Sequence, residues 1–188
     1  PKLHGTTYEA LDIPILGALS GNAKIEGGDF IWLDEKTIVV GCGFRSNREG
    51  IDQLNALLNP FDIKVIGFDL PVWQGAEACL HLMSMISPLD EKLALIYSPL
   101  MPTAFYNLLL EKGFTLLDCH PEEYLSSGGL NLNVLPVKPK ECIMIDGFPL
   151  TKQLMEDAGC KVQVFEGDAL CIACEGGPTC LTNPILRG

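Results

Sequence analysis

The chain has 188 residues, of which 47% are hydrophobic and 20% charged, and it carries a formal net charge of −11. This length suffices for one domain with a substantial core, and the composition excludes a disordered chain. No nucleic-acid partner is expected, because binding to phosphates requires a basic face that displaces counterions.

The chain has no run of about 18 consecutive apolar residues, so no membrane-spanning helix and no membrane partner are expected. Residues 1–17 lack the pattern of a signal peptide and begin with Pro1 rather than Met, which indicates a processed or truncated chain. Cysteines occupy positions 42, 79, 119, 142, 160, 171, 174 and 180, mostly within apolar, strand-like runs. Buried free thiols of this kind favour a reducing, cytoplasmic compartment.

The predicted elements form an internal repeat. Residues 6–20 read as a helix or strand remnant, and three segments follow, at about 24–70, 79–120 and 129–168. Each segment has the order strand, tight turn, strand, helix, strand. Residues 169–187 read as strand material after the third unit. Repeats of about 50 residues bury one face against a helix and stack on their neighbours.

Turns and helices are predicted at equivalent places in the three units. The turns lie between runs rich in Ile, Val and Leu, at 34–36, 90–92 and 139–141. In the first unit, apolar residues at 51, 54, 57 and 58 have the spacing of one buried helix face. In the second and third units the predicted helices end at Gly113 and Gly159, since glycine is typical of a helix C-terminus.

Three complete units flanked by two partial ones predict an α/β-propeller of ββαβ repeats, built as a single domain over residues 1–188. The ring is either incomplete in this chain or closed by pairing of its ends. An ordinary three-layer α/β sandwich is the alternative that the pattern leaves open.

Candidate catalytic residues lie at the ends of these units. The segment "EGGD" at 26–29 and the segment "EGG" at 175–177, just before Cys180, have the same form. A diglycine permits a tight turn or the close approach of a ligand. A plain turn with solvated carboxylates is the alternative explanation.

Glu26, His81 and Cys180 are expected at equivalent ends of successive units, and equivalent ends of a ring of repeats converge at its centre. A carboxylate, an imidazole and a thiol brought together are typical of nucleophilic thiol catalysis. Taken singly, each has an ordinary explanation. His81 lies in an apolar strand pattern, as a core histidine does, and Cys180 is one buried thiol among several.

A zinc site is the competing interpretation of Cys171, Cys174 and Cys180. It is disfavoured because structural zinc takes four ligands, and the chain has no second CxxC pair and no histidine after His120. Cys171 and Cys174 would also face opposite sides of the predicted strand. No metal is therefore expected.

The segments "IEGGDFIWLDEKTIVVGCGFRSNREGI", "HLMSMIS" and "GGPTCLTNPILR" carry a resemblance to known enzymes. Over about residues 24–187 the sequence resembles the guanidino-group-modifying enzymes, namely arginine deiminases, dimethylarginine dimethylaminohydrolases and amidinotransferases. The resemblance implies a five-bladed ββαβ propeller, the pentein fold. It also implies a hydrolase that cleaves a C–N bond at a guanidino carbon of a small cationic substrate, without metal or organic cofactor.

The resemblance assigns a role to each candidate residue. Cys180 matches the nucleophile that forms a thiouronium-type adduct, His81 matches the general acid/base, and Glu26 matches its acid partner. Arg45 matches an arginine that holds the α-carboxylate of the substrate. Asp29 matches the second acid of the motif, which either contacts the substrate or supports the turn.

One departure from the family pattern bears on the substrate. Deiminases and amidinotransferases usually place an Asp two residues after the histidine, and Met83 stands there in this chain. The dimethylarginine hydrolases also lack that Asp, so methylated arginine is the expected substrate, with arginine deiminase, arginine dihydrolase or amidinotransferase activity as alternatives. The chain also starts after the unit that supplies further substrate-binding carboxylates in the family. A non-catalytic propeller that acts by binding is the alternative of another class, and a homodimer is an allowed assembly.

Overall fold

The computed structural model of the chain describes residues 2–78, 80–173 and 176–182, so Cys79, Cys174 and Glu175, which entered the sequence predictions, lie outside the described residues. Within the described part, the strands form three sheets of three strands each. They are β1 (Phe30–Asp34), β2 (Thr37–Cys42) and β3 (Lys64–Asp69), then β4 (Ile86–Asp90), β5 (Leu93–Ile96) and β6 (Thr115–Asp118), then β7 (Leu135–Lys138), β8 (Glu141–Ile145) and β9 (Lys161–Phe165).

All three sheets have the same topology. The first strand pairs antiparallel with the second, and the third strand runs parallel to the second. A parallel pair requires a crossover connection, and a helix supplies it in every sheet. These helices are α2 (Arg48–Leu58), α3 (Thr103–Glu111) and α5 (Pro149–Asp157). The repeated ββαβ order confirms the predicted α/β class.

The three hairpins turn where the sequence predicted and share one irregularity. Their register shifts lie between Trp32 and Asp34, between Pro88 and Asp90, and between Pro136 and Lys138. Pro88 and Pro136 occupy first strands, which are edge strands of their sheets, so the ladder loses little from the missing N–H groups. An irregularity repeated at equivalent positions supports the interpretation of the chain as an internal repeat.

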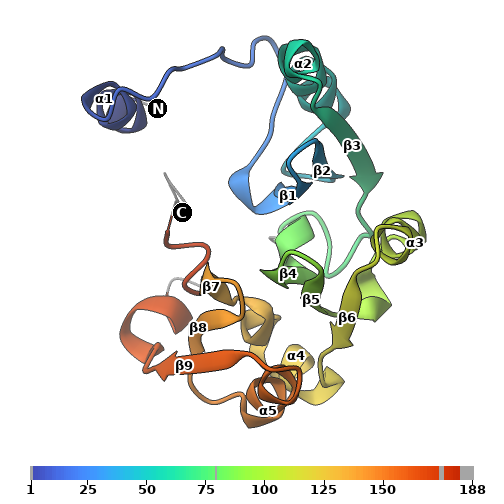
Figure 1. Ribbon diagram of the computed structural model, residues 1–188, viewed down its shortest axis with the longest axis vertical. Helices are drawn as coiled ribbons and strands as arrows, with labels where there is room; N and C mark the ends of the chain where they lie inside the picture. Colours follow the sequence, from blue (N-terminus) through green and yellow to red (C-terminus); the bar gives the residue numbers. More distant parts are fainter. Residues whose placement is uncertain (1, 79, 174–175, 183–188) are drawn as a thin grey trace.

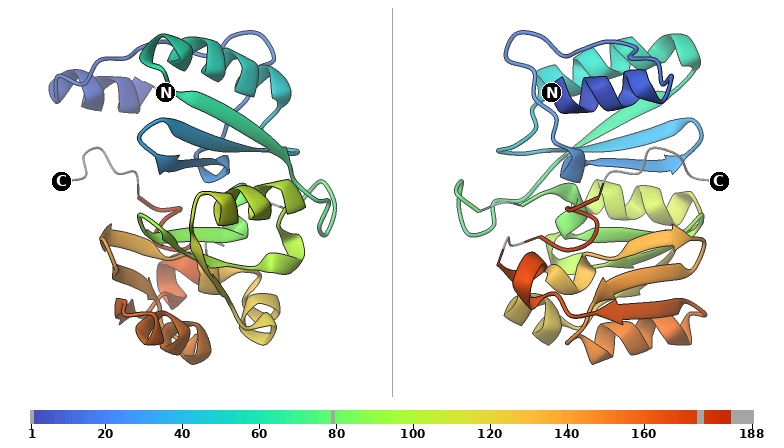
Figure 2. Two further views of the ribbon diagram at one scale, coloured as in Figure 1. Left: turned by 45° about the vertical axis from the view of Figure 1, so that its right-hand side comes forward. Right: turned by 90° about the vertical axis from the view of Figure 1, so that its left-hand side faces the viewer.

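The three sheets follow one another along an arc (Figure 1). In each sheet the first strand lies on the inner side of the arc, and α2, α3 and α5 lie on the outer side (Figures 1 and 2). Helix α1 (Lys2–Ala10) and the last described residues lie on the open side of the arc (Figure 1).

Short helices precede the inner strands. They are η1 (Gly27–Asp29) before β1, η3 (Leu82–Ser84) before β4 and η5 (Leu130–Leu132) before β7. Helix η3 contacts both η1 and η5. The starts of the three inner strands are therefore neighbours, and this is where the sequence predicted the candidate residues to converge.

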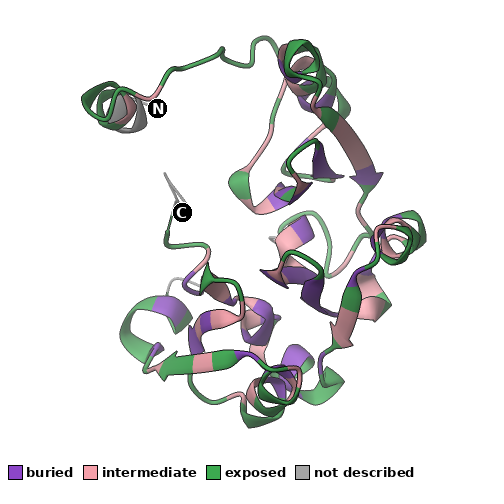
Figure 3. Cartoon of the chain, viewed as in Figure 1, coloured by how far each residue is buried: buried purple, intermediate pink, exposed green. Residues whose placement is uncertain are grey.

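The hydrophobic core lies between successive sheets and under the helices (Figure 3). One cluster joins the first two sheets through Val39, Ile86 and Phe105. A second joins the second and third sheets through residues such as Leu95 and Met144. Each interface buries branched and aromatic side chains from both neighbours, so each sheet stabilises the next.

Two helices end as the sequence predicted. Gly113 follows α3 with φ of +79°, and Gly159 follows α5 with φ of +86°. Both angles lie in the left-handed region, which glycine adopts without a steric penalty. A further helix, α4 (Pro121–Ser127), lies between the second and third predicted units, where no helix was predicted. The remaining short helices are η2 (Asn59–Phe61), η4 (Ser98–Leu100) and η6 (Asp168–Ile172).

The prediction of strand material at 169–187 is wrong in the described part. Residues 168–172 form the π-helix η6, and residues 178–181 form a turn. A strand needs a partner for its backbone groups, whereas this segment bonds locally, with Cys171 N donating to Gly167 O at 2.8 Å. At the other end, residues 2–10 are helical, one of the two structures left open for the segment from residue 6. In the described ranges no helix is long and apolar enough to cross a bilayer.

Candidate active site

Glu26 joins two of the other candidate residues. Its Oε2 lies 2.7 Å from His81 Nε2, and its Oε1 accepts a hydrogen bond from Arg45 Nε at 3.0 Å. Glu26 stands directly before η1, and His81 directly before η3, so the contact between these two turns brings the carboxylate to the imidazole. The Glu26 and Arg45 side chains are 39% and 43% exposed, whereas that of His81 is only 18% exposed. Glu26 and His81 therefore border solvent and remain accessible to a small molecule.

The surroundings of Glu26 favour its ionised form. Burial by itself raises the pKa of the carboxyl, but the hydrogen bonds from His81 and Arg45 outweigh it and bring the pKa below its ordinary value. Glu26 is thus an anionic acceptor at neutral pH.

Asp29 is fully buried and links the two turns from inside. Its Oδ1 accepts a hydrogen bond from Leu82 N at 2.9 Å, and its Oδ2 accepts one from Ser46 Oγ at 2.6 Å. Ser46 Oγ in turn accepts a hydrogen bond from Glu26 N at 2.9 Å. A single buried carboxylate therefore fixes the residue that follows His81 and, through Ser46, the backbone of Glu26.

The buried position of Asp29 changes its acidity. Burial raises the pKa of the Asp29 carboxyl, and the hydrogen bonds from Ser46 and Leu82 offset this only in part. Sequence reasoning selected Asp29 but missed Ser46. The only sequence feature that could have indicated Ser46 is its position between Arg45 and Asn47. Asn47 caps α2 by accepting a hydrogen bond from Gly50 N.

Gly28 leaves room for the imidazole ring. A Cβ added at Gly28 would lie 2.7 Å from His81 Cγ and 2.8 Å from its Nδ1. A Cβ at Gly27 would meet nothing within 4 Å. The diglycine therefore serves close packing against the His81 ring at its second position, a use that the sequence did not indicate.

Helix η3 is held in place beside His81. Ser84 Oγ accepts a hydrogen bond from His81 N at 3.1 Å, and Ser84 O accepts one from Tyr124 Oη at 3.0 Å. Met83, in the same turn, is partly buried and packs against the first hydrophobic cluster. Position 83 thus presents an apolar side chain that packs against the core.

Cys180 lies in the turn after η6, beside the start of β7. Its Sγ accepts a hydrogen bond from Asn133 Nδ2 at 2.8 Å. Asn133 Oδ1 accepts a hydrogen bond from Thr179 N at 2.8 Å, and Val134 O accepts one from Thr179 Oγ1 at 3.0 Å. The turn that carries the thiol is thus docked on the residues that lead into β7. Sequence reasoning missed Asn133, which stands in an ordinary apolar run.

Hydrogen bonds tie the start of β7 to the second sheet. Ser87 Oγ, in β4, donates to Val134 O at 3.1 Å. The inner strands of three successive sheets are thus preceded by Glu26, His81 and Asn133. Cys180 is hydrogen-bonded to Asn133.

The exposure of Cys180 separates it from the other described cysteines. Cys119, Cys142 and Cys171 are buried, and Cys180 is exposed. Burial raises the pKa of Cys119 to about 11 and that of Cys142 to about 12, so both stay protonated at neutral pH. In the residues that the structure describes, no group of three or more His, Cys, Asp or Glu side chains is placed to hold a metal ion.

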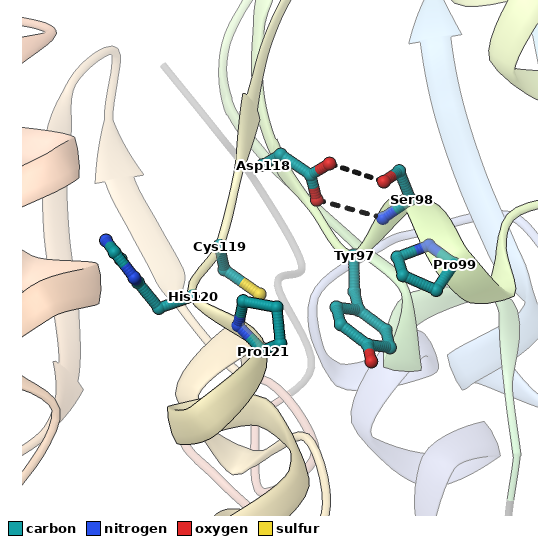
Figure 4. Close-up of a pocket in the computed structure, with 7 residues that line it drawn as sticks. All are labelled: Tyr97, Ser98, Pro99, Asp118, Cys119, His120 and Pro121. Carbon is teal, nitrogen blue, oxygen red and sulfur yellow. Dashed lines mark hydrogen bonds between the residues drawn. The ribbon is translucent and has the colours of Figure 1, made fainter.

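A separate hollow of about 280 Å³ lies at the ends of β5 and β6 (Figure 4). It is lined by Tyr97, Ser98, Pro99, Asp118, Cys119, His120 and Pro121. The Asp118 carboxylate accepts two hydrogen bonds from Ser98, one from its backbone N–H and one from its hydroxyl. The His120 ring points away from the other labelled side chains (Figure 4). None of the five candidate residues lines this hollow.

Comparison with known proteins places the chain in a family. The family model described as arginine deiminase matches residues 7–123, which is more than half of the chain. The chain belongs to the arginine deiminase family. One curated relative, an arginine deiminase of Listeria welshimeri, is 24% identical over 217 aligned residues, which cover 98% of this chain and 52% of that protein. The chain thus spans about half the length of the curated relatives it matches.

Solved structures agree on the fold of this arginine deiminase family member. The N-terminal domain of ArgZ, an arginine dihydrolase from the ornithine–ammonia cycle in cyanobacteria, matches with a TM-score of 0.76 and 22% identity, over 97% of this chain and 64% of that one. A dimethylarginine dimethylaminohydrolase from Pseudomonas aeruginosa, in complex with citrulline, matches with a TM-score of 0.65 and 19% identity, over 86% and 56%. These matches confirm the expected pentein-type fold.

Proposed function

We propose that the chain carries the catalytic residues of a hydrolase that cleaves a C–N bond at a guanidino carbon through a covalent cysteine intermediate. The observation that carries the proposal is the Glu26–His81 pair, 2.7 Å between Oε2 and Nε2, at the start of one inner strand and its neighbour. The exposed Cys180 thiol, bonded to Asn133 at the start of the third, supports it. Membership in the arginine deiminase family supports the guanidino substrate.

In the proposed reaction the Cys180 thiolate attacks the guanidino carbon and forms an S–C bond. The C–N bond to the leaving nitrogen then breaks, and His81, as imidazolium, gives that nitrogen its proton. Water next adds to the thiouronium carbon while His81 takes a proton back. The S–C bond breaks, citrulline leaves, and the thiolate is restored. Glu26 stabilises the imidazolium that the cycle requires.

The two remaining candidate residues divide into binding and support. We assign Asp29 to support of the turns, because it is fully buried and both its oxygens accept hydrogen bonds from within the protein. Arg45 is half-exposed and is held by Glu26, which leaves it the proposed contact with the α-carboxylate of the substrate.

The proposed substrate is methylated arginine. A carboxylate beside the guanidinium favours an unsubstituted group, because a methylated nitrogen has fewer hydrogens and leaves a buried acid partly unpaired. Met83 is apolar and packs on the core, so at position 83 this chain has no carboxylate that a methylated nitrogen would leave unpaired. Arginine is the alternative substrate, favoured by the arginine deiminase relatives.

Citrulline release tests both parts of the proposal. The full chain is incubated with arginine and with dimethylarginine, and citrulline is measured for the wild type and for Cys180→Ala. We expect release that Cys180→Ala abolishes, with dimethylarginine used at least as well as arginine. A tenfold preference for arginine, about 1.4 kcal/mol in the transition state, would overturn the methylated substrate. Equal release by wild type and Cys180→Ala would overturn the covalent mechanism.

A further inference from the structure

The orientation of the Asn133 amide is fixed by its neighbours. Thr179 N lies 2.8 Å from Asn133 Oδ1, and a backbone N–H is a donor that cannot accept. The carbonyl oxygen of the side chain therefore faces Thr179. The NH₂ group must then face Cys180 Sγ, also at 2.8 Å, and an amide NH₂ can only donate.

A donor directed at sulfur distinguishes between the two forms of the thiol. The thiolate is a strong acceptor, and a hydrogen bond to the charged form of a group favours that form. A protonated thiol is a weak acceptor and gains little from the same contact. The Asn133 amide thus favours the thiolate, the form that reacts as a nucleophile.

Packing holds the amide in this position. A Cβ added at Gly177 would lie 2.5 Å from Asn133 Cγ, so the backbone of Gly177 packs closely against the Asn133 side chain. Leu181 N donates to Gly177 O at 3.2 Å and closes the turn around Cys180. Thr179 Oγ1 anchors the same turn to Val134 O. Donor and sulfur are therefore held by the same hydrogen-bonded turn, which needs a glycine at position 177.

We propose that Asn133 is a catalytic residue, which holds the Cys180 sulfur as a thiolate and directs it by its side-chain amide. The inference deepens the proposed function and rests on it, because Asn133 acts in catalysis only where Cys180 is the nucleophile. The hydrogen bond itself does not depend on the substrate. It is therefore testable on the thiol alone.

The test is the pH dependence of alkylation of Cys180 by iodoacetamide, followed by mass mapping of the labelled cysteine. Asn133→Asp keeps the shape and the acceptor for Thr179 N but replaces the donor by an anionic oxygen. We expect the pH midpoint of alkylation to rise by about one unit or more, because a hydrogen bond to a charged group is worth at least that much. Asn133→Ala removes the donor, together with the acceptor for Thr179 N, but adds no charge, so it should raise the midpoint by less.

A matched control accounts for the change in the net charge of the molecule. Asn55 also accepts a hydrogen bond from a backbone group, Val65 N at 3.2 Å, and lies on α2, the crossover helix of the first sheet. Asn55→Asp should leave the midpoint at the wild-type value. If both Asn133 variants titrate like Asn55→Asp, the inference is overturned.

The result is separable from that of the citrulline assay. A chain that releases no citrulline but shows the shifted midpoint loses the proposed function and keeps the thiolate contact. In an active chain, Asn133→Ala should lower kcat by more than it raises KM, since the thiolate acts in the bond-forming step. The reverse pattern, with an unchanged midpoint, contradicts the proposal.

Discussion

At the scale of single residues, the candidate site depends on a close fit between a backbone and a ring. Gly28 packs against the His81 imidazole so closely that a methyl group in its place would lie 2.7 Å from Cγ. The imidazole ring cannot move aside without losing its contact with Glu26, whose Oε2 is 2.7 Å from Nε2. Gly28 is therefore required by contact with His81, and Gly27, which faces open space, is not.

This difference predicts opposite outcomes for two adjacent alanine substitutions. Gly28→Ala should lower kcat/KM by about a hundredfold, since a displacement of about 1 Å in a catalytic group costs that much. Gly27→Ala should stay close to wild type. Circular dichroism and urea unfolding check that both variants fold. Equal activity of the two variants would show that His81 does not need its observed position.

The sequence indicated charged and reactive candidates for the site but not the groups that hold them in the structure. Glu26, His81 and Cys180 belong to residue types with recognisable chemistry, and repeat symmetry indicated that they converge. Ser46 and Asn133 are common polar residues whose role depends on a partner far along the chain, such as Thr179 for Asn133. A pattern read along one chain does not contain that pairing.

At the scale of elements, an ion pair joins the first two units. Lys112, at the end of α3, donates to Asp34 Oδ2 at 2.6 Å and to Thr37 Oγ1 at 3.1 Å, across the first hairpin. Burial raises the pKa of Asp34, but the hydrogen bonds from Lys112 and Thr37 outweigh it and lower the pKa from 3.8 to about 2. The contact links a helix of the second unit to the turn of the first.

Asp34→Asn should therefore destabilise the chain in a pH-dependent way. Because the folded-state pKa lies below the unfolded value of 3.8, the contribution of Asp34 is complete above that pH and is lost as the pH falls toward about 2. About a third of the side chain is exposed, so screening limits the loss in unfolding free energy to about 1 kcal/mol at neutral pH. Urea unfolding at several pH values measures it.

The exposed pair of Lys152 and Glu156, 3.7 Å apart within α5, is the matched control. Glu156→Gln should cost only a few tenths of a kcal/mol, as is typical of exposed helix pairs. If Asp34→Asn costs no more than this control at neutral pH, the contact between the units contributes little to stability.

Elements that recur in the repeat units were predicted from the sequence, whereas α4 and η6, which lie outside the repeat pattern, were not. Helices α3 and α5 end at glycines that the sequence identified, because a helix stop is encoded locally. Helix α4 was missed, since a short segment opening with a Pro and two glutamates reads equally as a loop. Residues 169–187 were expected to be strand material, but a strand also needs a partner, and residues 168–172 form a π-helix instead.

At the scale of the whole molecule, the net charge of −11 creates a negative potential around a site proposed for a cationic substrate. The sequence indicated this charge but not where it acts. The structure places an ionised Glu26, 39% exposed, beside His81 at the starts of the inner strands. A cation approaching the site is therefore attracted both by the molecule as a whole and by the site.

This attraction predicts that the alkylation of Cys180 depends on salt only when the reagent is charged. Chloroacetamidine is cationic and iodoacetamide is neutral, and both alkylate a thiolate. Raising the ionic strength from about 0.01 M to about 1 M shortens the Debye length from about 30 Å to about 3 Å. The second-order rate constant for chloroacetamidine should fall by about threefold or more, because screening removes the steering of the cation. The rate constant for iodoacetamide should stay constant, which controls for any effect of salt on the thiol itself. A parallel decline for both reagents would place the effect of salt on the thiol, and the acidic surface would then have no part in bringing a guanidinium to Cys180.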